Sequence, residues 1–268
     1  MYQKLIETMR ETQPIVHCIT NYVTVADVAN TLLACGASPI MADDEREAAA
    51  ISSIAGALYL NIGTLNARTV AAMRVAGSRA AERRIPIVLD PVGAGASALR
   101  TDTVAELLAN LPIAIVRGNL SELRAIAGLD VASRGVDAAG GDEITDGNLA
   151  EVAALIAGRA RHYDGIFAVS GAIDLVSDGR RTLAIRGGDP QMTRITGAGC
   201  MLTGVIAAMA AANPEEPLAA TAAAMALMKR AGERAAATAN GTGSFRTAFI
   251  DAISDAEAKG GLRIESLA

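Results

Sequence analysis

A glycine-rich segment before a long apolar stretch is the first feature of the sequence that could take part in binding or catalysis. Thr196-Gly197-Ala198-Gly199-Cys200 immediately precedes a predicted apolar helix over Met201–Ala212. Two glycines in four residues let the backbone turn its N–H groups toward one point, and the helix dipole adds positive potential there. This pattern predicts an anion site of the kind that holds a phosphate. A helix-capping turn, in which the glycines only ease a bend, explains the spacing equally well.

Cys200 occupies the last position of this segment. A thiol at a helix N-terminus has a stabilised thiolate, which predicts a pKa below the reference value of about 8.5. The alternative is a small buried apolar residue, which is the commoner role of a free cysteine.

Polar residues also follow two predicted strands. Asp90 ends one of them, and the next is followed by Arg117, Asn119 and Glu122. The carboxyl ends of parallel strands line the ligand crevice of α/β proteins, so we expect these side chains to meet there. The carboxylates of Asp90 and Glu122 predict a hydrated Mg²⁺ ion, and the Arg117 fork predicts a phosphate contact. Helix capping by Asn119, with Glu122 three residues later, is the alternative, and both can hold together.

Two further patterns point to other chemistry. The segment Gly93-x-Gly95-x-x-Ala98 resembles a dinucleotide-binding fingerprint and, with Arg117, keeps an NADP-dependent oxidoreductase open as an alternative function. The intervening Asp90-Pro91 and the arginine in place of an acid at the next strand end weigh against it. His17 and His162 have no partner at the spacing of a metal site or a catalytic triad, and we predict structural roles for both.

The elements that must position these residues alternate between short β-type runs and longer helical patterns. Such alternation predicts an α/β fold with a mostly parallel sheet and helices on both faces. The predicted strands are Ile15–Ile19, Ser38–Met41, Ala57–Ile62, Ile85–Asp90, Ile113–Val116 and Ile166–Ser170, and helical spacing marks Val25–Ala34, Ala67–Arg83 and Leu149–Arg161.

The region after the last parallel strand follows a different pattern. Asp178-Gly179 separates the runs Asp174–Ser177 and Thr182–Arg186, which predicts an antiparallel hairpin at the sheet edge. Beyond it we find no strand pattern and expect core helices at Met201–Ala212 and Leu218–Ala239. Gly135–Gly147 is predicted to be a long surface loop, and residues 1–268 a single domain.

Composition limits the partners. The chain has 268 residues, is 51% hydrophobic and 20% charged, has net charge -5 and contains 3% aromatic residues without tryptophan. These values exclude disorder and argue against a nucleic-acid partner, which needs a basic surface and stacking aromatics. Three widely spaced cysteines, without a C-x-x-C pair, favour a reducing compartment. No segment is typical of a secretory signal or a membrane span, so we expect a cytoplasmic protein without a membrane partner.

Five collinear segments together resemble the hydroxyethylthiazole kinase family of the ribokinase-like superfamily, over essentially the whole length. They are Val16–Thr24, Gly36–Ala42, Leu89–Gly95, Arg117–Glu122 and Thr196–Cys200. The resemblance implies a three-layer αβα fold and ATP-dependent phosphorylation of the primary hydroxyl of 4-methyl-5-(2-hydroxyethyl)thiazole. It also implies a homotrimer with sites at the subunit interfaces. A non-catalytic nucleotide or metabolite sensor on the same fold stays open, because fold alone does not fix function.

The resemblance also implies roles for individual residues. Asn119-x-x-Glu122 matches an element that positions Mg²⁺, and Asp90 matches a second carboxylate on the metal side. Gly197, Ala198, Gly199 and Cys200 match the superfamily's anion hole, whose last residue is the base toward the acceptor hydroxyl. Arg117, Asn119 and Ser170 match positions for ATP. Met41 and Gly197 match positions for the thiazole alcohol, and Asn21 and Val23 are expected to line the same pocket.

Overall fold

One nine-stranded sheet organises the residues described by this computed structural model, which are 1–129, 143–255 and 261–267. The strand order is β2-β1-β3-β4-β5-β6-β7-β8-β9. The first six strands pair in parallel and the last three are antiparallel. Their bounds are β1 Ile15–Ile19, β2 Ser38–Met41, β3 Ala57–Asn61, β4 Ile87–Asp90, β5 Ile113–Gly118, β6 Ile166–Val169, β7 Asp174–Ser177, β8 Thr182–Arg186 and β9 Arg263–Leu267. The predicted α/β class with a mostly parallel sheet is confirmed.

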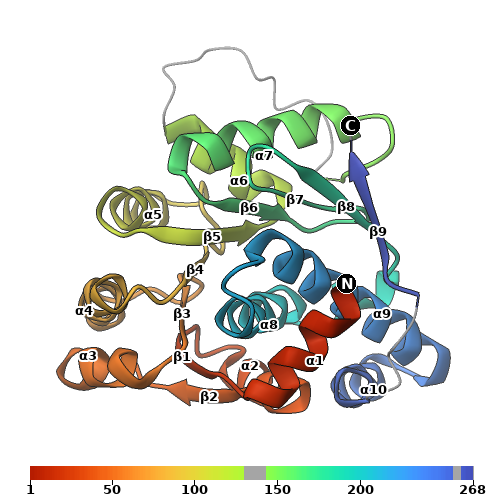
Figure 1. Cartoon of the computed structure of the whole chain (residues 1–268), viewed down its shortest axis with the longest axis horizontal. Helices are drawn as coiled ribbons and strands as arrows, with labels where there is room; N and C mark the ends of the chain where they lie inside the picture. Colours follow the sequence, from red (N-terminus) through yellow and green to blue (C-terminus); the bar gives the residue numbers. More distant parts are fainter. Residues whose placement is uncertain (130–142, 256–260, 268) are drawn as a thin grey trace.

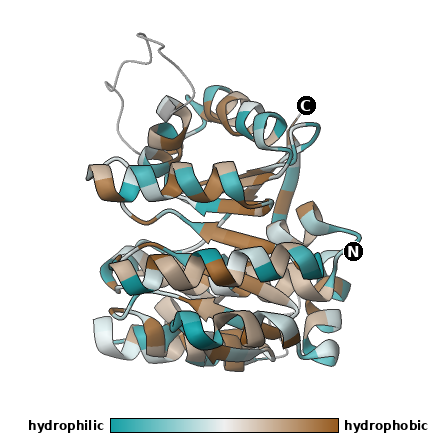
Figure 2. Cartoon of the chain, turned by 90° about the vertical axis from the view of Figure 1, so that its left-hand side faces the viewer, coloured by the Kyte–Doolittle hydropathy of each residue, from teal (hydrophilic) through white to brown (hydrophobic). Residues whose placement is uncertain are grey.

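Helices cover both faces of this sheet, as predicted (Figure 1). One face carries α1 (Tyr2–Thr12), α2 (Val25–Cys35), α8 (Ala198–Ala212), α9 (Pro217–Thr238) and α10 (Thr242–Ser254). The other carries α3 (Glu45–Ile54), α4 (Ala67–Arg83), α5 (Ala98–Asn110), α6 (Leu120–Leu129) and α7 (Leu149–Tyr163). Seen from the side, the outer helices mix hydrophilic and hydrophobic residues (Figure 2), as helices buried along one stripe do.

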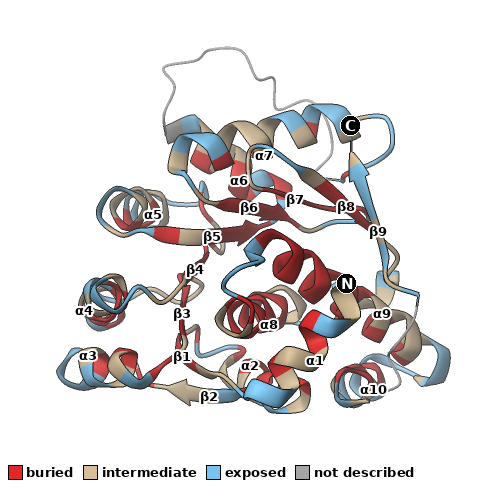
Figure 3. Ribbon diagram, in the orientation of Figure 1, coloured by how far each residue is buried: buried red, intermediate tan, exposed pale blue. Residues whose placement is uncertain are grey.

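Helix α8 differs from these outer helices, because it is buried almost throughout (Figure 3). Its run of Ala, Met, Val and Ile residues has no polar stripe, which suits a helix packed between the sheet and neighbouring helices. It contacts β1, β3 and β4 as well as α2 and α9. This packing fixes the start of α8 against the carboxyl ends of the central strands. No helix in the described ranges is long and apolar enough to cross a membrane.

The C-terminal part of the sheet corrects one prediction. The hairpin over β7 and β8 is confirmed, but it does not form the sheet edge, because β9 pairs antiparallel with β8. Only two positions of β9 are half-buried, so its sequence lacks the apolar run that marked the other strands. Pairing with β8 and the ion pair between Arg186 and Glu265, 2.7 Å apart, hold this strand in place.

Smaller differences concern element ends. Strand β5 continues to Gly118, β4 begins at Ile87, and β6 ends one residue before Ser170. Helix α8 begins at Ala198, three residues earlier than predicted, so the glycine-rich segment forms its first turn. Of the predicted loop Gly135–Gly147, residues 135–142 lie outside the described residues.

Candidate active site

Two adjoining cavities lie where the parallel strands end. The larger, of about 690 Å³, is bounded by the β6–β7 and β8–η1 loops and by α8 and α9, where η1 is a short 3-10 helix over Pro190–Arg194. The smaller, of about 350 Å³, is bounded by the segments that follow β1, β4 and β5 and by the start of α8. Arg117, Gly197 and Gly199 line both cavities. A shared wall of backbone amides and one guanidinium therefore lies between them.

The glycine-rich segment forms this wall. Gly197 is the N-cap residue of α8 and has φ 87°, a left-handed conformation that side-chain-bearing residues rarely adopt. The first intrahelical bond runs from the Met201 N–H to the Gly197 carbonyl, at 2.8 Å. The preceding N–H groups of the helix have no intrahelical acceptor, so an anion can use them. A Cβ atom on Gly199 would lie 2.5 Å from Nη1 of Arg117, so glycine permits the close approach of the guanidinium.

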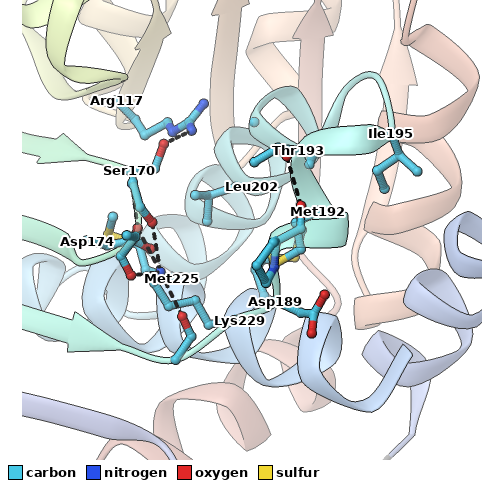
Figure 4. Close-up of a pocket in the computed structure, with 18 of the residues that line it drawn as sticks. Arg117, Ser170, Asp174, Asp189, Met192, Thr193, Ile195, Leu202, Met225 and Lys229 are labelled. Carbon is cyan, nitrogen blue, oxygen red and sulfur yellow. Dashed lines mark hydrogen bonds and ion pairs between the residues drawn. The ribbon is translucent and has the colours of Figure 1, made fainter. Parts of the chain in front are cut away.

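Arg117, only 8% exposed, is held from the end of β5. Its Nη2 donates to the Ser170 hydroxyl (Figure 4), and its Nη1 lies 4.0 Å from Oδ1 of Asp90. Two buried polar atoms at this point, Nε of Arg117 and Oδ1 of Asp90, have no hydrogen-bond partner among the described residues. Buried polar atoms without a partner are rare in folded proteins, and these two are available for contacts with a ligand.

Asp90 is anchored through its other oxygen. Oδ2 accepts from the Tyr59 hydroxyl at 3.2 Å, from Nδ2 of Asn61 at 3.0 Å and from the Thr203 hydroxyl at 2.9 Å. The Asp90 pKa is raised to about 6, chiefly by burial; Arg117 and the hydrogen bonds oppose the shift, and the nearby Glu122 carboxylate adds to it. The Asp90 carboxyl therefore titrates near neutral pH while one of its oxygens stays available.

Tyr59 and Asn61 contact the candidate site, and the sequence analysis missed both. Both lie in the buried strand β3, and Asn61 contacts Asp90 and Cys200 at once. The sequence does contain a sign of them: two side chains with polar groups stand at alternate positions of an otherwise apolar strand. Alternate positions lie on the same face of a sheet.

Glu122 has the capping role that was left open as an alternative. Its N–H donates to Oδ1 of Asn119 at 2.8 Å, and its Oε2 accepts from the Asn119 N–H at 2.8 Å, which is a reciprocal capping box. Oε1 accepts from the Gly93 N–H at 2.8 Å. The carboxylate lines the smaller cavity together with Asp90, so capping fixes its position there.

The predicted lowering of the Cys200 pKa is wrong. The thiol is only 9% exposed, and its sulfur accepts from Nδ2 of Asn21 and of Asn61, each at 3.3 Å. Burial raises the Cys200 pKa most strongly, and the charge of Asp90 raises it further, whereas hydrogen bonds from Thr24, Asn61 and Asn21 oppose the shift. Desolvation and a like charge outweigh the helix dipole here, so the group is a thiol at neutral pH.

We expect Cys200 to react with iodoacetamide more slowly at pH 7 than an unperturbed thiol does, with a rate that still rises above pH 8.5, because the thiolate is the nucleophile. Cys18 and Cys35 are fully buried, and burial raises both of their pKa values, that of Cys35 to about 12. Labelling at position 200 is followed by mass spectrometry. An Asp90→Asn variant should label faster; rapid labelling of the parent chain at pH 7 would contradict the pKa direction.

Comparison with known proteins decides the family. A family model described as "Hydroxyethylthiazole kinase family" matches residues 6–259. A hydroxyethylthiazole kinase from Desulfovibrio desulfuricans is 44% identical over 265 residues, covering 95% of this chain and 93% of the relative. The chain belongs to the hydroxyethylthiazole kinase family. It is thus related to phosphotransferases, as the resemblance implied.

Solved structures of relatives agree with the fold. The hydroxyethylthiazole kinase protein from Pyrococcus horikoshii OT3 has a TM-score of 0.89 and 35% identity, and the match covers 100% of this chain and 99% of that one. A ribokinase-like superfamily protein from Enterococcus faecalis, with a TM-score of 0.61 and 12% identity, covers 94% of this chain and 88% of its own. The latter shows the fold alone, and the predicted ribokinase-like architecture is confirmed.

The resemblance implied that Asn21, Val23, Met41 and Gly197 of this chain contact the thiazole alcohol. The structure brings Asn21, Val23 and Gly197 to the smaller cavity. Met41 lines neither cavity. It lies half-buried at the end of β2, where it pairs in register with Cys18 of β1. Within one chain, therefore, the predicted alcohol residues are only partly assembled.

The competing sequence patterns have structural explanations. The Gly93 and Gly95 amides donate to Glu122 and to the Thr101 hydroxyl, so neither is available for a pyrophosphate as the dinucleotide fingerprint requires. Buried His17 bonds to the Ser52 hydroxyl and to the Ala42 carbonyl, both at 2.8 Å, as a structural histidine does. The contacts of Gly93 and Gly95 disfavour the oxidoreductase alternative.

Proposed function

We propose that this member of the hydroxyethylthiazole kinase family transfers the γ-phosphoryl group of ATP to the primary hydroxyl of 4-methyl-5-(2-hydroxyethyl)thiazole. The observation that carries the proposal is the wall shared by two cavities, made of the α8 N-terminus and Arg117. A phosphoryl group at this wall faces a donor on one side and an acceptor on the other. In-line displacement needs this arrangement, because catalysis of phosphoryl transfer rests on positioning and charge stabilisation.

The larger cavity suits the nucleotide. Its lining includes the apolar side chains of Ile195, Leu202, Met225 and Met228, and the adaptable thioethers suit a flat base. Ile195, Leu202 and Met225 are labelled in Figure 4. The lining also includes Arg117, Ser170 and the start of α8. The terminal phosphates would lie at these amides and at the guanidinium fork. Asn119, which was matched to ATP, lines the smaller cavity and not the larger one.

Asp90 and Glu122 would hold Mg²⁺. Within the described ranges there is no group of three or more His, Cys, Asp or Glu side chains placed to bind a metal. Mg²⁺ commonly uses one or two carboxylates and completes its shell with water and phosphate oxygens. This pair fits, because Oδ1 of Asp90 accepts no hydrogen bond from the described part of the chain. The bound ion would neutralise charge on the phosphates.

The role we assign to Cys200 is modest. Because its pKa is raised, the thiol does not carry a negative charge at neutral pH. A loose phosphoryl-transfer transition state needs little prior deprotonation of the acceptor, and a general base contributes only about 10²–10⁴-fold. The backbone amides of Gly197, Ala198 and Gly199 therefore contribute more to the rate of phosphoryl transfer than Cys200 does. The role of Cys200 is to orient the acceptor hydroxyl.

Release of ADP tests the activity. The chain is incubated with Mg²⁺-ATP, with and without the thiazole alcohol, and ADP is measured in a coupled assay. ADP release that depends on the alcohol supports the kinase, whereas nucleotide binding without release would indicate the sensor. A thermal shift with NADP⁺ that exceeds the shift with Mg²⁺-ADP would contradict the proposal and restore the oxidoreductase.

We further propose that residues 1–268 form one domain that assembles as a homotrimer with its sites at the subunit interfaces, in a cytoplasmic setting. Val23 lines the smaller cavity yet is 57% exposed, so this wall is incomplete in one chain. Met41 of a neighbouring chain would complete it. The free thiols Cys18, Cys35 and Cys200 support a reducing compartment. Light scattering should give a mass three times that of one chain.

Replacing Glu122 with glutamine is expected to raise the Mg²⁺ concentration that gives half-maximal rate, because one carboxylate of the metal pair loses its charge. A titration of rate against Mg²⁺ at saturating ATP measures the effect. Glu151→Gln is the matched control, since Glu151 also lies in the first turn of a helix but is exposed and lines neither cavity. An unchanged Mg²⁺ dependence in Glu122→Gln would remove Glu122 from the metal site and leave it only its capping role.

A further inference from the structure

Lys229 of α9 is buried in the wall of the larger cavity, with only 5% of the residue exposed. Its Nζ donates to the carbonyl oxygens of Gly171 at 3.0 Å, Ala172 at 3.1 Å and Gly187 at 3.2 Å. Oδ1 of Asp174 lies 3.1 Å away. Four oxygens therefore surround one ammonium nitrogen. Figure 4 shows Lys229 beside Asp174.

This arrangement is unusual for a lysine, because a buried ammonium needs a counter-charge and acceptors for all three protons. Asp174 supplies the charge and is itself buried, with a second contact from the Gly171 N–H at 2.9 Å. The remaining ligands are backbone carbonyls. Carbonyl oxygens arranged around one point can replace the hydration shell of a small monovalent cation. The four oxygens have the chemistry of such a cation site, with the lysine head group as its occupant.

The carbonyls come from two separate loops of the larger cavity. Gly171 and Ala172 follow Ser170, which accepts from Arg117. Gly187 lies beyond β8 and has φ 109°, a left-handed conformation that turns its carbonyl toward Lys229. Without a cation, the carbonyl dipoles of the two loops would face one another and repel. The ammonium therefore joins the loops and, through Ser170, supports the position of Arg117.

We propose that the Lys229 ammonium is a built-in monovalent cation that fixes the two loops of the larger cavity, and that removing the side chain leaves a site for a free cation of similar size. Lys229 is thus a positioning residue, since its protons are already used by carbonyls. A lysine that serves only to pack against its neighbours would not leave a site that discriminates between cations. The kinetic part of the test rests on the proposed kinase function, but the stability part does not.

The experiment compares the full-length chain with its Lys229→Ala variant in chloride salts of choline, sodium, potassium and ammonium at constant ionic strength. In choline we expect kcat/KM for ATP to fall on the order of 10²-fold, chiefly through KM, because the loops lose their geometry. Ammonium or potassium should restore most of that loss and raise the Tm of the variant. The parent chain should respond equally to all four salts.

Three further variants sharpen the result. Lys4→Ala removes an exposed lysine and should show no cation selectivity. Adding Asp174→Asn to Lys229→Ala removes the carboxylate from the cage and should abolish the response to ammonium. Lys229→Arg keeps the charge, but a planar fork cannot present its protons to oxygens around one point, so it should not restore KM.

Two results would overturn the proposal. One is a Lys229→Ala chain whose Tm and kcat/KM are the same in choline and in ammonium. The other is a variant that fails to fold in every salt, because an empty cation site should be filled by ammonium. A variant that folds only with ammonium or potassium supports the proposal. If the parent chain releases no ADP, the proposed function fails while the Tm comparison still decides the role of Lys229.

Discussion

Gly197→Ala is expected to lower kcat by about 10²–10³-fold while the chain still folds. Losing or misplacing one backbone donor of an anion site costs about 2.7–4 kcal/mol of transition-state stabilisation. The added methyl group would lie 2.6 Å from Cγ2 of Thr24, and φ of 87° is strained for any residue with a side chain. The first turn of α8 must therefore shift, and its amides shift with it. Steady-state kinetics with ATP and the thiazole alcohol measure the loss.

Gly158→Ala is the matched control. It makes the same change inside α7, where a Cβ atom would meet nothing within 4 Å. Alanine is a better helix former than glycine, so this variant should keep full activity and gain about 0.5–1 kcal/mol of stability. If Gly197→Ala kept the parent kcat, the amides of α8 would not be the phosphoryl site.

The main features of this site could be read from the sequence because they depend on local patterns. Glycines before an apolar helix and polar residues at strand ends have meanings that hold in most α/β folds, and the structure brings Asp90, Arg117 and Gly197 together around the smaller cavity. The hairpin over β7 and β8 was similarly local, since Asp178-Gly179 specifies a tight turn.

The features that were missed depend on tertiary packing. The pKa of Cys200 is set by burial and by Asp90, a residue 110 positions away in the sequence, rather than by its own helix. Tyr59 and Asn61 belong to an apolar strand, and the sequence does not show which face of the sheet their side chains lie on. Strand β9 exists because β8 offers an edge for pairing, and Lys229 is meaningful only beside the carbonyls of two distant loops. Such contacts have no periodic signature.

Replacing Arg117 with methionine is expected to lower kcat/KM on the order of 10³-fold, as loss of a guanidinium that stabilises transferring phosphoryl oxygens does. The change also leaves Asp90 without the cation that lowers its pKa, which is already raised to about 6 by burial. The pKa of Asp90 should therefore rise further. Because the carboxylate form is the one that would bind Mg²⁺, the acid limb of the pH profile of kcat/KM should move to higher pH.

Stability should follow the same titration. A carboxyl group whose pKa is higher in the folded state binds its proton more tightly there, so folding is favoured at low pH and the penalty grows as pH rises from about 4 through 6. Arg117→Met enlarges that penalty, and its Tm deficit should be larger at pH 8 than at pH 5. Adding Asp90→Asn should remove the pH dependence of the deficit.

Arg117→Lys is the control that keeps the positive charge near Asp90, so the pH profile of kcat/KM should match that of the parent. The rate should still fall, because an ammonium lacks the fork that reaches Ser170 and the phosphates together. A pH profile in Arg117→Met identical to that of the parent would show that Asp90 does not govern the acid limb.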